Sequence, residues 1–311
     1  MRLTQRGLQL VLAVGWLVNA GLQAQHFMFT SAFAAEVISP AGDNQPTFVA
    51  GPVHTVAGWV GTHPAIWNAA VVTLQALIGL GMLTRRFARP ALAASVLWSL
   101  SVWWLAEGFG GIFGGGSNLV TGAPGAAVLY AVLALAAWPQ LDRLRSRWSA
   151  QARRPPAGWL VAVWALVWTL GAIAQVWTDQ RDGPDLAARL AGAGTDAPSW
   201  LYRLDGRLAR WVGHTGLTVV LCLAAAEALI GLGALRPGRS RMIACAAGIV
   251  LAAAFWVVGQ GLAGITTGHA TDPGTGPLLV LMGVAVLASN PVRRGNSSRR
   301  RLGAGRRSRR P

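Results

Sequence analysis

The amino-acid sequence predicts an all-α, polytopic membrane protein with eight transmembrane helices, arranged as two parallel four-helix repeats. Composition is the first reason, because apolar residues fill 53% of the 311 positions and charged residues only 12%. Soluble domains carry about 25% charged residues. The second reason is a series of eight apolar runs, and the third is a set of motifs that recur in the same order in both halves of the chain.

The internal repeat is visible in four pairs of matching segments. The central pair is Gln-Ala-Leu-Ile-Gly-Leu-Gly at 75–81 and Glu-Ala-Leu-Ile-Gly-Leu-Gly at 227–233, separated by 152 residues. The other pairs, separated by 150 to 153 residues, are 21–25 with 171–175, 59–61 with 211–213, and 107–112 with 260–265. Matches that keep their order with so little drift indicate a duplication.

The apolar runs are the predicted membrane spans, and most approach the ~20 residues that a bilayer core requires. They lie at 8–22, 66–83, 91–106 and 125–138 in the first repeat, and at 158–176, 216–235, 242–258 and 277–289 in the second. The run at 8–22 also fits a secretory signal, but its counterpart lies in mid-chain, so we interpret it as a retained helix. The fourth and eighth runs are short, and their Gly- and Pro-rich lead-ins are candidates for re-entrant segments.

Arginine placement gives the orientation. All 27 basic residues are arginines, and with eight spans and an inner N-terminus 22 of them fall on the cytoplasmic side. Five of these lie between positions 143 and 154, and they would face outward, against the positive-inside rule, if the fourth run did not cross. We therefore expect a plasma-membrane protein with both termini in the cytoplasm.

These assignments divide the chain into four parts. They are a first membrane repeat at 1–140, an Arg-rich cytoplasmic linker at 141–157, a second membrane repeat at 158–291 and a basic tail at 292–311. The tail holds nine arginines among Gly, Ser and Asn, a composition that predicts disorder and attraction to anionic lipid. We therefore expect the lipid bilayer as a partner and no binding of nucleic acid.

Two long segments, 25–64 and 178–215, then fall on the outer side as loops between the first and second spans of each repeat. Within the second segment, apolar residues recur at helical spacing, namely Leu201, Leu204, Leu208, Trp211 and Val212. This pattern predicts a helix that lies on the outer membrane surface with these residues on one face.

Glu227 is the most distinctive polar residue, because it lies near the middle of a predicted span. A charge at that depth costs at least ~2.5–3.5 kcal/mol on insertion scales, so the side chain must face the bundle interior or carry a proton. It is a candidate for a proton relay or for a contact to a quinone head group. The alternative is a protonated carboxyl that hydrogen-bonds a neighbouring helix. Its counterpart Gln75 favours this alternative, because an amide makes the same hydrogen bonds but relays no proton.

A second group of polar residues lies in two glycine-rich outer segments. Glu107 begins the first segment, and its counterpart Gln260 begins the second, which also contains His269 and Asp272. Segments without bulky side chains let the backbone approach a ligand or another helix closely. A ligand-binding mouth and tight turns packed between helices are both consistent with this composition.

Signatures of metal binding and nucleophilic catalysis are absent from the sequence. All five histidines fall on the outer side, and none belongs to an HxxH, HxH or HExxH pattern. No Ser/His/Asp or Cys/His arrangement is readable, and no histidine lies in an apolar run where it would hold a haem. We therefore assign no catalytic residue, no metal site and no covalently bound cofactor.

In each repeat a long outer segment leads to Gln/Glu-Ala-Leu-Ile-Gly-Leu-Gly, and in the first repeat the turn Thr84-Arg85-Arg86-Phe87 and an Ala-rich span follow. This pattern resembles the DoxX/DoxD-like family of four-helix membrane proteins. Glu227 matches a Glu that is frequent in that family, whereas Gln75 departs from it. The resemblance implies a quinone as ligand and a membrane redox partner protein, since members are associated with quinone-linked oxidation of sulfur compounds or with redox-stress complexes.

Three functional hypotheses follow. The first is a membrane component of a quinone-linked redox or redox-stress system, not catalytic alone, that binds its ligand near Glu227 or Glu107. The second is a small-molecule transporter, which requires an open cavity between the repeats that reaches Glu227. The third is a structural scaffold in which the polar residues only join helices.

Overall fold

The computed structural model describes residues 3–115, 117–139, 157–177, 183–193 and 197–289. Within these ranges the regular secondary structure is entirely helical, as the sequence predicts. The predicted linker at 141–157, apart from its last residue, and the predicted tail at 292–311 lie outside the described residues.

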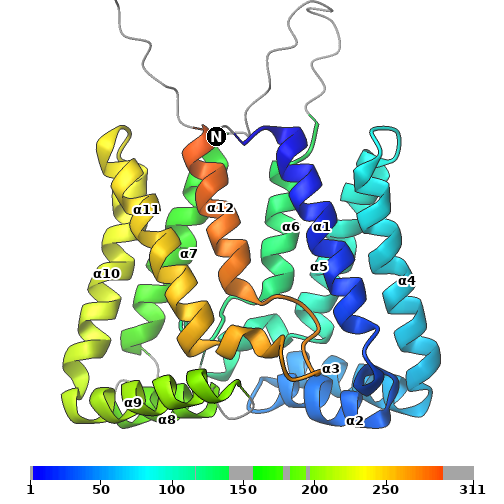
Figure 1. The fold of residues 1–311 in the computed structure, drawn as a ribbon, viewed down its shortest axis with the longest axis horizontal. Helices are drawn as coiled ribbons and strands as arrows, with labels where there is room; N and C mark the ends of the chain where they lie inside the picture. Colours follow the sequence, from blue (N-terminus) through cyan, green and yellow to red (C-terminus); the bar gives the residue numbers. More distant parts are fainter. Residues whose placement is uncertain (1–2, 116, 140–156, 178–182, 194–196, 290–311) are drawn as a thin grey trace, which may run out of the picture.

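The long helices stand side by side and form the body of the molecule (Figure 1). In the first repeat they are α1 (Gln5–Gln23), α4 (Pro64–Leu83), α5 (Ala88–Leu105) and α6 (Ala126–Ala136). In the second repeat they are α7 (Ala157–Trp177), α10 (Leu217–Leu235), α11 (Arg239–Ala254), which continues into η5 (Phe255–Gly259), and α12 (Thr275–Ser289).

Four of the described helices are long and apolar enough to cross a membrane, namely α4, α7, α10 and α11 with η5. A fifth candidate is α5 together with the 3-10 helix η4 (Gly108–Gly114), which is bent by 40° relative to α5. The helices at the predicted fourth and eighth spans, α6 and α12, are shorter apolar helices. The structure therefore supports a membrane protein with four or five helices of spanning length.

The outer segment 25–64, which the sequence suggests is a loop, is largely helical. It contains η1 (His26–Phe29), α2 (Ser31–Phe33), η2 (Ala34–Ile38), η3 (Ser39–Gly42) and α3 (Thr47–Thr62). These elements lie across one end of the bundle and enclose a small apolar core of their own that includes Met28, Phe33 and Val53. Because the segment buries apolar side chains against itself, it folds as a unit at this end.

The corresponding segment of the second repeat contains α8 (Gly183–Ala193) and α9 (Ser199–Thr215) at the same end of the bundle. The predicted surface helix is present. Of the residues on its predicted apolar face, Leu201 and Val212 are buried, whereas Leu204 and Trp211 are exposed. The helix packs against α8 and η5.

The first two long helices of each repeat approach closely at a glycine. A Cβ atom at Gly79 of α4 would lie 3.0 Å from the Ala13 carbonyl oxygen of α1, and one at Gly231 of α10 would lie 2.9 Å from the Ala165 carbonyl oxygen of α7. Gly231 follows Gly79 by 152 residues, and Ala165 follows Ala13 by the same number. The first helices therefore correspond at an offset of 152 and not 150, and the counterpart of Gln175 is Gln23.

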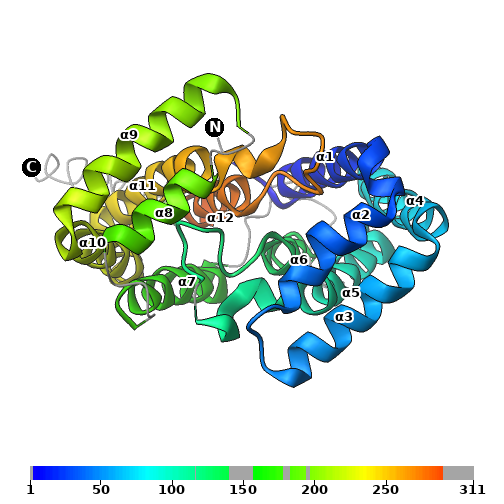
Figure 2. The same ribbon diagram turned by 90° about the horizontal axis from the view of Figure 1, so that it is seen from below.

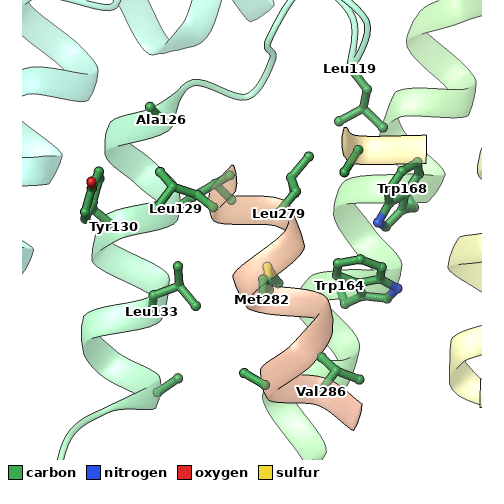
Figure 3. Packing of buried hydrophobic residues seen from close by; sticks show 14 of the residues in the cluster. Leu119, Ala126, Leu129, Tyr130, Leu133, Trp164, Trp168, Leu279, Met282 and Val286 are labelled. Carbon is green, nitrogen blue, oxygen red and sulfur yellow. The ribbon is translucent and has the colours of Figure 1, made fainter. Parts of the chain in front are cut away.

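The contact between the repeats is filled by apolar side chains. Leu129 and Leu133 of α6, Met282 and Val286 of α12, and Trp164 of α7 are all buried in one cluster, and Figure 3 shows how they interlock. A continuous apolar core thus joins the two halves.

At the end of the bundle opposite α3 and α9, arginines bind the C-terminal carbonyl groups of two long helices. The Arg6 guanidinium donates to the Met82 carbonyl oxygen of α4 at 2.9 Å, and the Arg241 guanidinium donates to the Ala234 carbonyl oxygen of α10 at 2.7 Å. A cation at this position satisfies carbonyl groups that have no partner within the helix.

Candidate functional site

A cavity of about 340 Å³ lies inside the first repeat, between α1, α4 and α5, and α3 and the α2–η2 segment cover one end of it. Figure 2, which is viewed from this end of the bundle, shows α3 on the same side of the molecule as α4 and α5. The cavity walls are mostly apolar and aromatic, and they include Trp16, Phe33, Val56, Trp59, Trp67, Val71, Trp98 and Val102. A space of this size and character is typical of sites for small molecules.

Three residues that line the cavity carry polar atoms without hydrogen-bond partners. Among the described residues, Gln75 Oε1, Trp98 Nε1 and Ser99 Oγ are buried and unpaired. A buried polar atom without a partner costs about 1–3 kcal/mol. A ligand with a polar group in this cavity offsets that cost, whereas a purely apolar ligand does not.

Other polar side chains at the cavity wall are fixed by hydrogen bonds between helices. Gln23 Nε2 donates to Asn68 Oδ1 at 2.6 Å, and Asn68 Nδ2 donates to the Gln23 carbonyl oxygen at 2.9 Å. The Tyr130 hydroxyl donates to Asn19 Oδ1 at 3.1 Å. These bonds connect α1 to α4 and α6, so this part of the wall is held in one arrangement before any ligand binds.

Two carboxyl groups line the cavity at the end that α3 covers, one from each repeat. Glu107 accepts a hydrogen bond from the Ala127 backbone N–H at 3.0 Å, at the beginning of α6. Asp272 accepts from the Gly274 N–H at 2.7 Å and from the Thr271 hydroxyl at 3.0 Å. Burial raises the pKa of Asp272, and these two hydrogen bonds act in the opposite direction. This end of the cavity therefore carries two carboxyl groups, one from each repeat.

A second, more open hollow of about 420 Å³ lies beside this end, between the two glycine-rich segments. It is lined by four of the residues that the sequence suggests for ligand binding, namely Glu107, Gln260, His269 and Asp272. The His269 ring stacks on Phe27 of the first repeat with a centroid distance of 4.0 Å. Because Glu107 and Asp272 line both spaces, they lie at the boundary between the cavity and the open hollow.

The remaining two predicted residues are separated from each other. Gln75 lines the cavity of the first repeat, whereas Glu227 is fully buried in the second repeat. Gln175 Nε2 donates to Glu227 Oε1 at 3.2 Å, and Glu227 Oε2 has no partner among the described residues. The structure thus places Gln75 and Glu107 at one cavity, and Glu227 outside it.

Trp98, Ser99 and Asn68 line the cavity but are not among the residues that the sequence suggests. The signal that finds Glu227, a polar residue inside an apolar run, also applies to Asn68 and Ser99. A neutral side chain costs less in a membrane than a charged one, so this signal is weaker for them.

No protein-family model, curated protein or solved structure matches this chain. It is a helical protein with several helices of membrane-spanning length and an apolar cavity that contains unpaired polar atoms.

Proposed function

We propose that this protein binds a lipid-soluble small molecule with a polar group in the cavity of the first repeat. One observation carries the proposal: the cavity combines apolar walls with the unpaired polar atoms of Gln75, Trp98 and Ser99. An apolar ligand body matches the walls, and a polar group on that body forms the missing hydrogen bonds.

Within this ligand class we propose a quinone or its reduced form, following the resemblance to the DoxX/DoxD-like family. A quinone ring carries polar oxygens on an aromatic body with an apolar tail, which suits walls rich in tryptophan. In this proposal the protein holds no prosthetic group and acts with a membrane redox partner protein.

The described residues favour ligand binding over transport between the repeats. The contact between the repeats is packed with apolar side chains, and Glu227 has no exposed surface. A path along this contact requires the space that Leu133 and Met282 now fill (Figure 3).

The proposal includes eight crossings of the plasma membrane, with both termini in the cytoplasm and α3 and α9 at the outer surface. Trp59 of α3 and Trp211 of α9, which are 152 residues apart, are 59% and 56% exposed. Indole rings favour the membrane–water interface, and these two support that placement.

Cysteine labelling tests the orientation. In a chain in which Cys222 and Cys245 are replaced by alanine, a cysteine is introduced either at Thr62 or at Arg86. A membrane-impermeant maleimide applied to intact cells is expected to label T62C and not R86C. The reverse pattern would rule out the proposed orientation.

Titration with a short-chain quinone tests the ligand site. Purified protein in nanodiscs is titrated while its tryptophan fluorescence is measured, because Trp16, Trp67 and Trp98 line the cavity. Val71→Phe, which places a larger side chain in the cavity, is expected to weaken binding by about tenfold or more. A tenfold change corresponds to about 1.4 kcal/mol of binding free energy. Val72→Phe is the control, since the neighbouring Val72 does not line the cavity. Equal weakening by both variants, or none by either, contradicts the proposed site.

A further inference from the structure

A loop of the first repeat enters the interior of the second repeat. Leu119 is only 2% exposed, and its side chain lies against Gly171 of α7, where it leaves no room for a Cβ atom. The Cβ position of Gly171 is also 3.1 Å from Glu227 Oε2. Figure 3 shows Leu119 next to Trp168. Leu119 therefore fills the space between α7 and α10 beside Glu227.

This space corresponds to the cavity of the first repeat. Trp168, Gly171, Gln175 and Glu227 each follow by 152 residues a residue that lines the cavity, namely Trp16, Asn19, Gln23 and Gln75. The backbone of Leu119 fits the same correspondence, because its carbonyl oxygen accepts a hydrogen bond from Gln260 Nε2 at 3.4 Å. Gln260 is the counterpart of Glu107, which lines the cavity.

The loop of the second repeat lacks the side chain that would fill the cavity in the same way. Trp103 Nε1 donates to the Pro124 carbonyl oxygen at 2.6 Å, and Trp256 Nε1 donates to the Pro273 carbonyl oxygen at 2.8 Å. The two prolines therefore hold equivalent positions, and the loops can be aligned on them. In this alignment Leu119, five residues before Pro124, corresponds to Gly268, five residues before Pro273. A Cβ atom at Gly268 would meet only Gln25, which does not line the cavity. The second loop therefore places no leucine in the cavity of the first repeat.

We propose that Leu119 is a built-in substitute for a ligand and that the ligand of the first repeat binds in the corresponding way. Its hydroxyl group lies against Glu107 and donates a hydrogen bond to the carboxyl, at the place that corresponds to the contact between the Leu119 carbonyl and Gln260. Its methyl-branched aliphatic part lies beside Trp16 and Asn19, as the Leu119 side chain lies beside Trp168 and Gly171. The ligand is thus a lipid-soluble molecule with an isoprenoid type of chain. This inference rests on the proposed function and adds the ligand's chain type and orientation.

Two alcohols test the chain type. Farnesol has methyl branches and double bonds along its chain, and 1-dodecanol has a chain of the same length with neither. Native mass spectrometry of the full chain in detergent is expected to show one bound farnesol, held about tenfold more tightly than 1-dodecanol, because methyl groups that fit the cavity bury additional apolar surface. This comparison uses the unmodified protein and depends on no variant.

The outcomes separate the two proposals. Equal affinity for farnesol and 1-dodecanol overturns the inference and leaves the proposed function standing. If neither alcohol nor a quinone binds the unmodified protein, both proposals are overturned.

Discussion

Glu107 and Gln260 hold the same position in the two repeats, and each caps the last helix of its own repeat. Glu107 accepts from the Ala127 N–H at 3.0 Å, and Gln260 Oε1 accepts from the Gly276 N–H at 3.2 Å. The shared function is to satisfy a backbone donor at the beginning of α6 or α12. A carboxyl and an amide both do this, which explains why the residue type differs between repeats.

The cap leads to a prediction for the stability of the first repeat. Glu107→Ala is expected to lower the free energy of unfolding by about 1 kcal/mol, the typical cost of a lost cap. Glu107→Gln is expected to stay close to the unmodified protein, because the amide oxygen still accepts the bond. Unfolding in detergent, followed by circular dichroism, measures both. Glu36→Ala is the control, since Glu36 is exposed. A loss of stability in E107Q equal to that in E107A contradicts the cap.

Gly108 and Gly261 lead to a second prediction, because both adopt left-handed backbone angles, with φ of +52° and +54°. A Cβ atom at either position would overlap a carbonyl oxygen, that of Ala41 or that of Ala193. Each glycine-to-alanine variant is expected to lose more than about 1–3 kcal/mol, the cost of backbone strain alone. Gly51→Ala in α3 is the control, since a Cβ atom there meets nothing within 4 Å. Thermal unfolding that leaves G108A and G261A as stable as G51A is the contrary result.

The third prediction compares Gln75 with its counterpart Glu227. Gln75→Leu is expected to weaken quinone binding by about tenfold, because the proposed ligand would lose a hydrogen-bond partner in the cavity. A tenfold change in affinity corresponds to about 1.4 kcal/mol. Glu227→Gln is expected to leave binding unchanged, because an amide oxygen still accepts the bond from Gln175. Fluorescence titration of both variants makes the comparison. If E227Q weakens binding and Q75L does not, the ligand site belongs to the second repeat.

Asp205 leads to a prediction of pH dependence. Neither carboxylate oxygen has a hydrogen-bond partner among the described residues, and burial raises the pKa of Asp205 from its ordinary 3.8 to about 6. The folded protein therefore binds more protons than the unfolded chain in this interval. This contribution to stability is present below the ordinary pKa and is lost as the pH rises from 3.8 to about 6.

Asp205→Asn is the matching variant. Near neutral pH it is expected to raise the melting temperature, by about 2–4 °C for each 1 kcal/mol gained in the free energy of unfolding. At pH values below the ordinary pKa of Asp205 it is expected to change the melting temperature little. The exposed Glu36 provides the control variant Glu36→Gln. Melting curves across this range check the difference. An equal effect at both ends of the range would show that the Asp205 charge is not the cause.

The glycine-rich segments illustrate how far the sequence determined the site. Their composition and their repetition predicted a shared structure around Glu107 and Gln260, and the pairing of these residues follows from the repeat. The repeat does not predict that Glu107 lies near Asp272 and His269. These residues line the same hollow only because the loops of the two repeats lie beside each other. Contacts between distant segments depend on how loops are exchanged, which local patterns do not record.

The sequence by itself determined the helical class, the positions of the long apolar helices and the correspondence between the halves. These properties depend on local hydrophobicity and on repeated motifs. Only the tertiary structure decided the register of 152 between the first helices, the helical nature of segment 25–64 and the location of the cavity in the first repeat. The physical reason is that these properties depend on side chains that meet from distant parts of the chain. Leu119, for example, fills the space beside Gly171 of the second repeat.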